Sequence, residues 1–325
     1  MDPNLRNSIT ELIRGARRIL LVTHVAPDGD AIGSLLGLAW LLRAQGKEVT
    51  LFCEDGVPEV YAWLPGSAEI VRQAGDLHDL VISLDCSDER RMGAELQGAV
   101  TGIPLVNIDH HVTNTSFGTI NWVDPSSVST TQMILELADS LGWHVPQPVA
   151  VCLLCGLITD TRSFRTYNVD TAAVQAALRL MEAGASLNEL TRRVLDRRPL
   201  ASVRLWGQAI DRLHLEGDIL WTEVTREMRQ RWALDENGDS GLANFLSGVR
   251  EPKVVVVFTE RKDGTIDVGM RSVPGYDVAQ VAYRLGGGGH PQAAGCTLEG
   301  NFVDIRERVL AEVRRALANL SAQDT

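Results

Sequence analysis

Near the start of the chain, short apolar runs flank a longer stretch with helical spacing. Residues 18–23 (RILLVT) and 47–53 (KEVTLFC) are rich in aliphatic and β-branched side chains, which is typical of strands. Between them, residues 31–45 repeat Leu, Ile and Trp at helical spacing. The Pro/Gly/Asp-rich segment 24–30 predicts a loop in which Asp30 caps the following helix. The pattern therefore predicts a βαβ unit.

Two further apolar runs predict strands of the same sheet. Residues 79–84 (DLVISL) and 104–108 (PLVNI) each run directly into acidic residues. Continuous hydrophobic strands are typical of a parallel sheet that is buried on both faces. Helical length and apolar spacing recur at residues 129–141, 149–159 and 171–183. We therefore expect a doubly wound, mainly parallel α/β domain over residues 1–186.

The pattern changes in the second half of the chain. Residues 187–205 predict a helical linker, and the apolar runs that follow it are separated by turn signals. Three strands are predicted, at residues 218–225, 253–261 and 265–272, with a hairpin turn at 262–264. Helices are predicted at residues 278–285 and 303–320. We expect a smaller α+β domain over residues 206–325, with the active site in the cleft between the two domains.

Composition and charge narrow the classes of partner. A chain of 325 residues is long enough for two separate hydrophobic cores. Its net charge of −11 at pH 7 argues against tight binding of long nucleic acid, which requires a basic track along many phosphates. A small anionic substrate is still compatible, because bound cations and one or two arginines can supply a local positive site.

No segment predicts export or membrane insertion. The N-terminus lacks a basic start followed by an apolar stretch, and the longest apolar runs stop well short of the roughly 20 residues that span a bilayer. The five cysteines have irregular spacing, which favours free thiols in a reducing compartment. Cys152 and Cys155 lie in an apolar helical segment and predict buried packing rather than metal ligation. We expect a cytoplasmic protein with no membrane association.

Acidic and imidazole side chains gather at the ends of the predicted apolar elements. The five aspartates and three histidines concerned are, in chain order, His24, Asp28, Asp30, Asp85, Asp109, His110, His111 and Asp160. In an open α/β sheet, ligands bind outside the carboxyl ends of the strands, so we expect these segments to converge. For any single Asp, a helix cap or a solvated loop residue is the simpler interpretation. The whole set on one rim would repel strongly without cations.

The types of ligand favour hard or borderline divalent ions. Carboxylates and imidazoles with no thiolate nearby suit Mn²⁺, with Mg²⁺ or Co²⁺ as alternatives, better than structural Zn²⁺. Ligands shared between two groups suggest two ions. Two neighbouring cations can lower the pKa of a bridging water and stabilise charge on phosphoryl oxygens, which predicts phosphoester hydrolysis.

These motifs closely resemble those of the DHH phosphoesterases. The likeness rests on Asp109-His110-His111, on His24-x-x-x-Asp28-x-Asp30 and Asp85 upstream, and on Asp160 downstream. The resemblance implies two Mn²⁺ ions bridged by Asp85 and held by His24, Asp28, Asp30, Asp85, His110 and Asp160. It also implies that Asp109 orients the neighbouring imidazole and that His111 acts on the scissile phosphate as a hydrogen-bond donor or general acid. The choice between Asp109 and His110 as direct ligand stays open.

The second domain carries a separate signature. Its Gly286-Gly-Gly-Gly289-His290 run is similar to the GGGH motif of the DHHA1 domain, which in that family binds the substrate away from the metals. The backbone N–H groups of Gly288 and Gly289 could approach a phosphate or base closely because no side chain intervenes. His290 could contact the terminal phosphate or base, and Arg271 could hold a phosphate through two hydrogen bonds.

The chain departs from the family at one position. Many relatives carry Gly after the Thr-Asp-Thr motif that contains Asp160, whereas this chain carries Arg162, which could alter access to the site. Arg165 is a candidate phosphate contact and could equally be a structural residue.

Within the family, a two-domain chain of this length resembles the nanoRNase type, which degrades very short RNA and removes the 3′-phosphate of adenosine 3′,5′-bisphosphate. Phosphodiesterases of cyclic dinucleotides such as c-di-AMP, or of linear dinucleotides, are close alternatives that the sequence does not separate. A non-catalytic nucleotide sensor is a further alternative, although every expected ligand position is filled. The resemblance also implies a homodimer.

Overall fold

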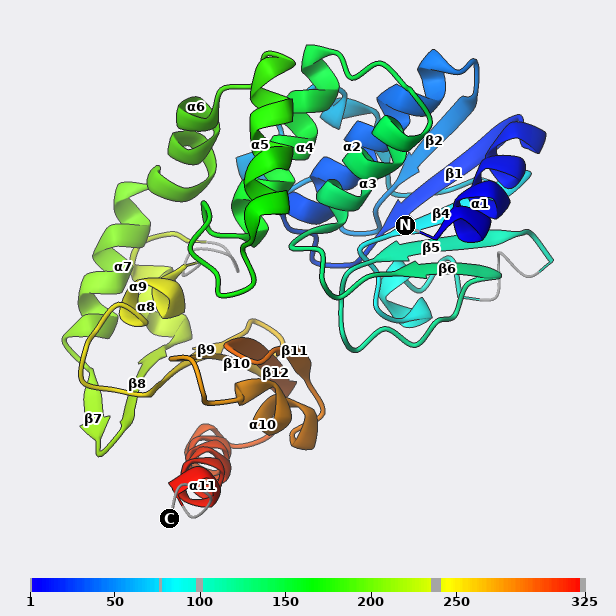
Figure 1. Ribbon diagram of the computed structural model, residues 1–325. Coiled ribbons are helices and arrows are strands. Elements are labelled where there is room, and N and C mark those ends of the chain that lie inside the picture. The colour runs from blue at the N-terminus through cyan, green and yellow to red at the C-terminus, as the bar shows by residue number, and fades with distance from the viewer. Residues whose placement is uncertain (1, 76–77, 98–101, 235–240, 322–325) are drawn as a thin grey trace. The chain divides into compact units, whose positions relative to one another are not determined.

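The chain forms two compact units, Met1–Arg197 and Arg198–Thr325, each built around its own six-stranded sheet (Figure 1). The computed structural model describes residues 2–75, 78–97, 102–234 and 241–321. The division between the units falls inside the segment 187–205.

The sheet of the first unit has the strand order β3-β2-β1-β4-β5-β6, and every pairing in it is parallel. The strands are β1 (Arg18–Thr23), β2 (Glu48–Phe52), β3 (Ile70–Val71), β4 (Leu80–Leu84), β5 (Leu105–Asp109) and β6 (Ile120–Val123). The order reverses between β1 and β4, which are hydrogen-bonded neighbours. The segments that follow these two strands therefore leave the same edge of the sheet at the point where α/β folds bind ligands.

Both faces of this sheet are buried, which explains why its strands appear as continuous hydrophobic runs. Helices α2, α3 and α4 lie on one face (Figure 1), where Ile19 and Leu21 of β1 join their core. Leu20 and Val22 point to the other face, which is covered by shorter segments that include Met92. The helices are α1 (Pro3–Gly15), α2 (Gly29–Ala44), α3 (Thr130–Ser140), α4 (Gln147–Asp160), α5 (Thr171–Glu182) and α6 (Leu187–Thr191), with a π-helix over Arg192–Asp196 and 3₁₀ turns η1 (Glu59–Tyr61), η2 (Ser67–Glu69) and η3 (Glu89–Met92). The predicted parallel α/β domain is confirmed.

Helices α2 and α4 pack in very close contact through glycines. A Cβ atom added to Gly33 would lie 2.5 Å from the backbone oxygen of Cys152, and one added to Gly37 would overlap the side chain of Leu153. On α4, a Cβ at Gly156 would lie 2.8 Å from Oδ1 of Asp30. The absence of side chains at these glycines thus lets the start of α2 approach the end of α4.

The second unit contains a mixed sheet with the order β11-β12-β10-β9-β8-β7, in which only β8 and β9 run parallel. Its strands are β7 (His214–Glu216), β8 (Ile219–Val224), β9 (Val254–Glu260), β10 (Ile266–Ser272), β11 (Gly288–His290) and β12 (Ala293–Leu298). The predicted hairpin between β9 and β10 is confirmed, because Arg261 N–H donates to the carbonyl of Thr265 across a turn with Gly264 at φ +90°. Part of the glycine run forms the edge strand β11.

Helices cover both faces of the second sheet. Val256 and Phe258 of β9 pack in the same core as α10 and α11, whereas Val255 and Val257 pack with α7 and α9. The helices are α7 (Leu200–Ile210), α8 (Arg226–Arg231), α9 (Leu242–Leu246), α10 (Val278–Arg284) and α11 (Phe302–Ser321). Within the described residues, no helix is both long enough and apolar enough to cross a membrane.

We expect Gly33→Ala to lower the free energy of unfolding by about 1–2 kcal/mol, because the added methyl group forces α2 away from the Cys152 carbonyl. Gly207→Ala is the matched control, since Gly207 lies in α7 with no atom within 4 Å of an added Cβ. The control should be stabilised by roughly 0.5–1 kcal/mol through its gain in helix propensity. Urea unfolding of both variants, followed by circular dichroism, measures the difference. Equal midpoints for the two variants would contradict the close packing of α2 and α4.

Candidate metal centre

The loop after β1 carries the first group of ligand candidates. The ring of His24 is buried, and Ala26 adopts a left-handed backbone with φ +52°. Asp28 caps α2, because its Oδ1 accepts from the N–H groups of Asp30 at 2.9 Å and Ala31 at 3.0 Å. The sequence-based assignment of this cap to Asp30 is therefore wrong, since Asp30 already lies inside the first turn of the helix.

Asp30 instead caps a different helix. Its Oδ2 accepts from Thr130 N–H at 2.6 Å, and its Oδ1 accepts from Thr131 N–H at 3.0 Å and from the Thr131 hydroxyl at 2.7 Å. Both threonines open α3, so the positive end of that helix faces a fully buried carboxylate. The contact joins residues a hundred positions apart and ties the first motif to the opposite side of the site.

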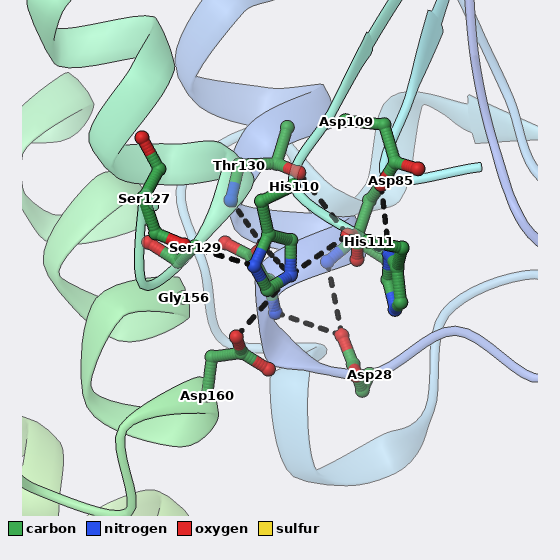
Figure 2. A network of polar contacts seen from close by, with 12 residues as sticks. Asp28, Asp85, Asp109, His110, His111, Ser127, Ser129, Thr130, Gly156 and Asp160 are labelled. Carbon is green, nitrogen blue, oxygen red and sulfur yellow. Dashed lines mark hydrogen bonds and ion pairs between the residues drawn. The ribbon is translucent and has the colours of Figure 1, made fainter. Parts of the chain in front are cut away.

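Asp85 lies at the centre of the cluster (Figure 2). It directly follows β4, is almost completely buried, and has a left-handed backbone with φ +63°. Its carboxylate accepts from the Thr130 hydroxyl at 3.1 Å. A left-handed backbone costs a non-glycine residue roughly 1 kcal/mol or more, and such strain is common at functional sites.

Three imidazoles face the Asp85 carboxylate. Nε2 of His24 lies 3.5 Å from Oδ2, while Nε2 of His110 and Nδ1 of His111 each lie 3.6 Å from Oδ1. His110 also lies 3.3 Å from Asp160, which ends α4. The structure therefore brings together residues that follow β1, β4, β5 and α4, as the sequence predicts.

The end of β5 holds a second carboxylate and imidazole pair. Oδ1 of Asp109 lies 2.7 Å from Nδ1 of His111, and its Oδ2 accepts from the side-chain amide of Asn114 at 2.5 Å. Asn114 was missed in the sequence analysis, because a single Asn in a polar turn carries no pattern of its own. These contacts fix the orientation of both Asp109 and the His111 ring.

Burial opposes ionisation of the carboxylates in this cluster. Burial raises the pKa of Asp85 well above its usual range, and Asp30 adds to the rise. Burial also raises the pKa of Asp160 to about 8, although the nearby His110 works against this. For His110 itself burial would lower the pKa, but Asp160 and Asp85 outweigh it, and the pKa is raised. The cluster therefore has more negative charge than its protein surroundings stabilise, which is the condition that bound cations relieve.

The donor atoms fit a metal ion. Among the sets of three side chains that lie wholly in the first unit, three place their ligand atoms within 4.8 Å of one another, and Asp85 belongs to each of them: His24, Asp28 and Asp85; Asp30, Asp85 and His110; Asp85, Asp109 and His111. All of these donors are carboxylate oxygens or imidazole nitrogens, and burial raises the pKa of the neighbouring Cys155 thiol to about 12. Such a set suits a hard or borderline divalent cation.

Four predicted substrate-binding residues lie in the second unit. Arg271 on β10 and His290 on β11 both pair with Ala293 of the strand between them, so they occupy one row across the sheet. Nε of Arg271 donates to Oδ1 of Asn244 at 2.6 Å, which fixes the plane of the guanidinium. Gly289 has φ +135°, and a Cβ there would lie 2.6 Å from the Ala293 oxygen, so the strand depends on glycine. Gly288 lies beside it on β11.

The fifth predicted substrate-binding residue, Arg165, lies in the first unit. It is exposed in the turn after α4, and its Nε donates to the Arg162 carbonyl at 2.7 Å. Arg162, Ser163 and Phe164 form three consecutive left-handed residues with φ between +50° and +62°. Within the described residues, the Arg165 side chain contacts the Arg162 carbonyl and no residue of the aspartate and histidine cluster.

A further positive group was missed in the sequence analysis. Nη2 of Arg91, in η3, lies 2.9 Å from Nδ1 of His24. The two residues are 67 positions apart, and Arg91 belongs to none of the sequence motifs, so only the fold reveals the contact.

Comparison with known proteins identifies the family of the chain. The DHH family N-terminal domain matches residues 18–157, and the DHHA1 domain matches residues 232–319. The chain is 37% identical over 306 residues to the bifunctional oligoribonuclease and PAP phosphatase NrnA of Thermus thermophilus, covering 92% of this chain and 90% of that protein. It is 25% identical to the cyclic-di-AMP phosphodiesterase GdpP of Geobacillus thermodenitrificans, covering 95% of this chain but 49% of that protein. A solved exopolyphosphatase-related protein from Bacteroides fragilis shares the fold, with a TM-score of 0.88 at 24% identity over 98% of this chain and 96% of that chain.

Asp85→Asn should raise the unfolding temperature of the metal-free protein and reduce the stabilisation that Mn²⁺ provides. In EDTA we expect the variant to unfold at a higher temperature than the wild type, because a buried carboxylate beside Asp30 is removed. Mn²⁺ at a hundredfold excess over its Kd should stabilise the wild type by about 2.7 kcal/mol and the variant much less. Thermal unfolding with EDTA or Mn²⁺ measures both effects.

The control for this measurement is Asp139→Asn, since Asp139 is half exposed and pairs with Arg179. It should retain the full response to Mn²⁺. An equally large response in Asp85→Asn would show that the ion binds elsewhere.

Proposed function

The chain belongs to the DHH/DHHA1 family, and from this membership we propose that it is a metal-dependent phosphoesterase that hydrolyses short oligoribonucleotides and dephosphorylates adenosine 3′,5′-bisphosphate. The observation that carries the proposal is the central Asp85, which belongs to all three sets of ligand atoms that lie wholly in the first unit. The 37% identity to an oligoribonuclease and PAP phosphatase across nearly the whole chain supports the choice of substrate.

We propose that His24, Asp28, Asp30, Asp85, His110 and Asp160 would hold two Mn²⁺ ions. When bound, the ions supply an activated water and positive charge for the phosphoryl oxygens. Backbone hydrogen bonds hold both carboxylates in place, because Asp28 and Asp30 each accept hydrogen bonds from the first turn of a helix. This preorganisation supports their assignment as ligands.

His111 is proposed as the proton donor to the leaving oxygen. Its Nδ1 contacts Asp109, which fixes the ring and leaves Nε2 as the other ring nitrogen. Burial would lower the pKa of His111, but the hydrogen bond to Asp109 and the charge of Asp85 outweigh it, and the pKa is raised. A raised pKa favours the protonated imidazole, which is the form that a general acid requires.

The second unit is proposed to bind the nucleotide. Arg271 and His290 share one row of its sheet, and Asn244 holds the guanidinium of Arg271. A guanidinium with a fixed plane suits a phosphate, and the backbone at Gly288 and Gly289 is not shielded by side chains.

Substrate choice is tested with purified protein and Mn²⁺, offering a dinucleotide RNA, a longer RNA, adenosine 3′,5′-bisphosphate and cyclic di-AMP in parallel. We expect turnover of the dinucleotide and the bisphosphate to exceed that of the other two substrates. Asp109→Ala should lower kcat at least about 100-fold, because His111 loses its orienting partner.

Other outcomes of this panel point to other functions. Preference for cyclic di-AMP would favour the cyclic-dinucleotide phosphodiesterase, a function that the similarity to GdpP keeps as the second candidate. Binding of Mn²⁺ without turnover of any substrate would favour a nucleotide sensor.

Arg271→Gln should raise KM for the dinucleotide by about 10- to 100-fold, since a hydrogen bond to a charged group contributes roughly 1.5–3 kcal/mol. Binding of Mn²⁺ should not change, because Arg271 lies in the unit that does not carry the aspartate and histidine cluster. Arg261→Gln is the control, since Arg261 pairs with Asp267 near the hairpin of the same sheet. An unchanged KM in Arg271→Gln would remove this residue from the substrate site.

A further inference from the structure

The backbone of Arg91 is fixed against the loop that carries His24. Arg91 lies in η3, which follows β4 and Asp85. Its carbonyl accepts from Val25 N–H at 2.8 Å, and the next side chain, Met92, is completely buried in the core. The hydrogen bond to the Arg91 carbonyl and the burial of the neighbouring Met92 therefore fix the backbone position of Arg91.

The Arg91 guanidinium contacts an imidazole in a cluster rich in aspartates. Its Nη2 lies 2.9 Å from Nδ1 of His24, and the side chain is half buried. Arg91 forms no ion pair with any carboxylate in the part of the chain that the structure describes. Its positive charge reaches further into the cluster, where it opposes protonation of both His24 and His111. The guanidinium thus has no direct ion pair, although its charge also acts on the carboxylate of Asp88.

The neighbouring arginine is arranged in the opposite way. Arg90 is 82% exposed and binds Asp88 through Nε and Nη2, both at 2.9 Å. Two consecutive residues of one 3₁₀ turn therefore differ, since one guanidinium is paired on the surface and the other is held inside without a carboxylate. A surface ion pair therefore accounts for the position of the Arg90 side chain but not for that of the Arg91 side chain.

The contact between Arg91 and His24 also competes with another contact. Nδ1 of His24 lies 2.8 Å from the Val25 carbonyl as well as 2.9 Å from Nη2 of Arg91. The carbonyl requires a proton on Nδ1, whereas Arg91 requires a lone pair there. A cation ligand at Nε2 needs a free lone pair on that nitrogen, so the ring proton must lie on Nδ1. The Nδ1–H group then donates its hydrogen bond to the Val25 carbonyl. In that tautomer Arg91 has no acceptor on the ring, and its N–H groups become available to an anion.

We propose that Arg91 is a phosphate-binding residue of the metal centre, which donates hydrogen bonds to non-bridging oxygens of the substrate phosphate. The inference rests on the proposed phosphoesterase function. A guanidinium stays charged at every relevant pH, and its planar fork matches two phosphate oxygens. Orientation of the His24 ring does not require Arg91, because the Val25 carbonyl already provides it.

The test compares Arg91→Gln, Arg91→Lys and the control Arg90→Gln. We expect Arg91→Gln to lower kcat/KM for the dinucleotide about 10- to 100-fold and Arg91→Lys to recover part of the loss, since lysine keeps the charge but not the fork. Arg90→Gln should match the wild type. Thermal unfolding identifies any variant that fails to fold. If Arg91→Gln does not fold, the activity of Arg91→Lys is compared with that of the wild type instead.

Two calorimetric titrations separate phosphate binding from a role in positioning His24. Inorganic phosphate should bind the Mn²⁺-loaded Arg91→Gln variant about 10-fold more weakly than the loaded wild type, while Mn²⁺ should bind both metal-free proteins equally. A loss of Mn²⁺ affinity that accounts for the lost activity would overturn the proposal in favour of positioning. If the wild type is active and Arg91→Gln is equally active, the proposed role of Arg91 in phosphate binding is also overturned. An inactive wild type would instead overturn the proposed function.

Discussion

The structure depends on keeping several carboxylates buried around Asp85. Ionised carboxylates in such a place repel one another and lose hydration, so each one needs donors that replace water. The chain supplies them from different elements: the buried Asp30 is held by the start of α3 and the buried Asp109 by His111 and Asn114, while the exposed Asp28 is held by the start of α2. These donors fix the oxygens without neutralising the cluster, and the remaining negative charge is left for cations.

The same requirement explains the close packing of the helices. Asp30 begins α2 and Asp160 ends α4, and both carboxylates face Nε2 of His110, at 3.9 Å and 3.3 Å. Oxygens from two different helices can meet at one imidazole only if the helices approach closely, which Gly33 and Gly156 allow. The packing of α2 against α4 therefore also determines the geometry of the site. A methyl group added at Gly33 can disturb both.

The sequence was sufficient to predict β1, β2, β4 and β5 and to propose the ligand candidates, because both follow from local patterns, but α1 and β12 were not predicted. Continuous apolar runs give buried parallel strands, and the residues directly after β4 and β5 must lie on one edge of the sheet. Local patterns do not specify which partner each side chain chooses. Asp30 was expected to cap its own helix but binds Thr130 and Thr131, and Arg91 binds His24 in a loop 67 residues away. Short edge strands such as β3 and β11 were also not predicted, since two or three residues carry no periodicity.

The charge distribution connects these contacts with the size of the proposed substrate. The chain has a net charge of −11, so a long nucleic acid would gain little from counterion release along its surface. Under the proposed function, each unit supplies its own attraction for phosphate, through Arg91 and the cations in the first unit and through Arg271 in the second. Each such group can hold one phosphate, and additional nucleotides would bring more negative charge without more partners. A site of this kind gains most from a substrate with only one or two phosphates, which is the composition of a dinucleotide or a nucleoside bisphosphate.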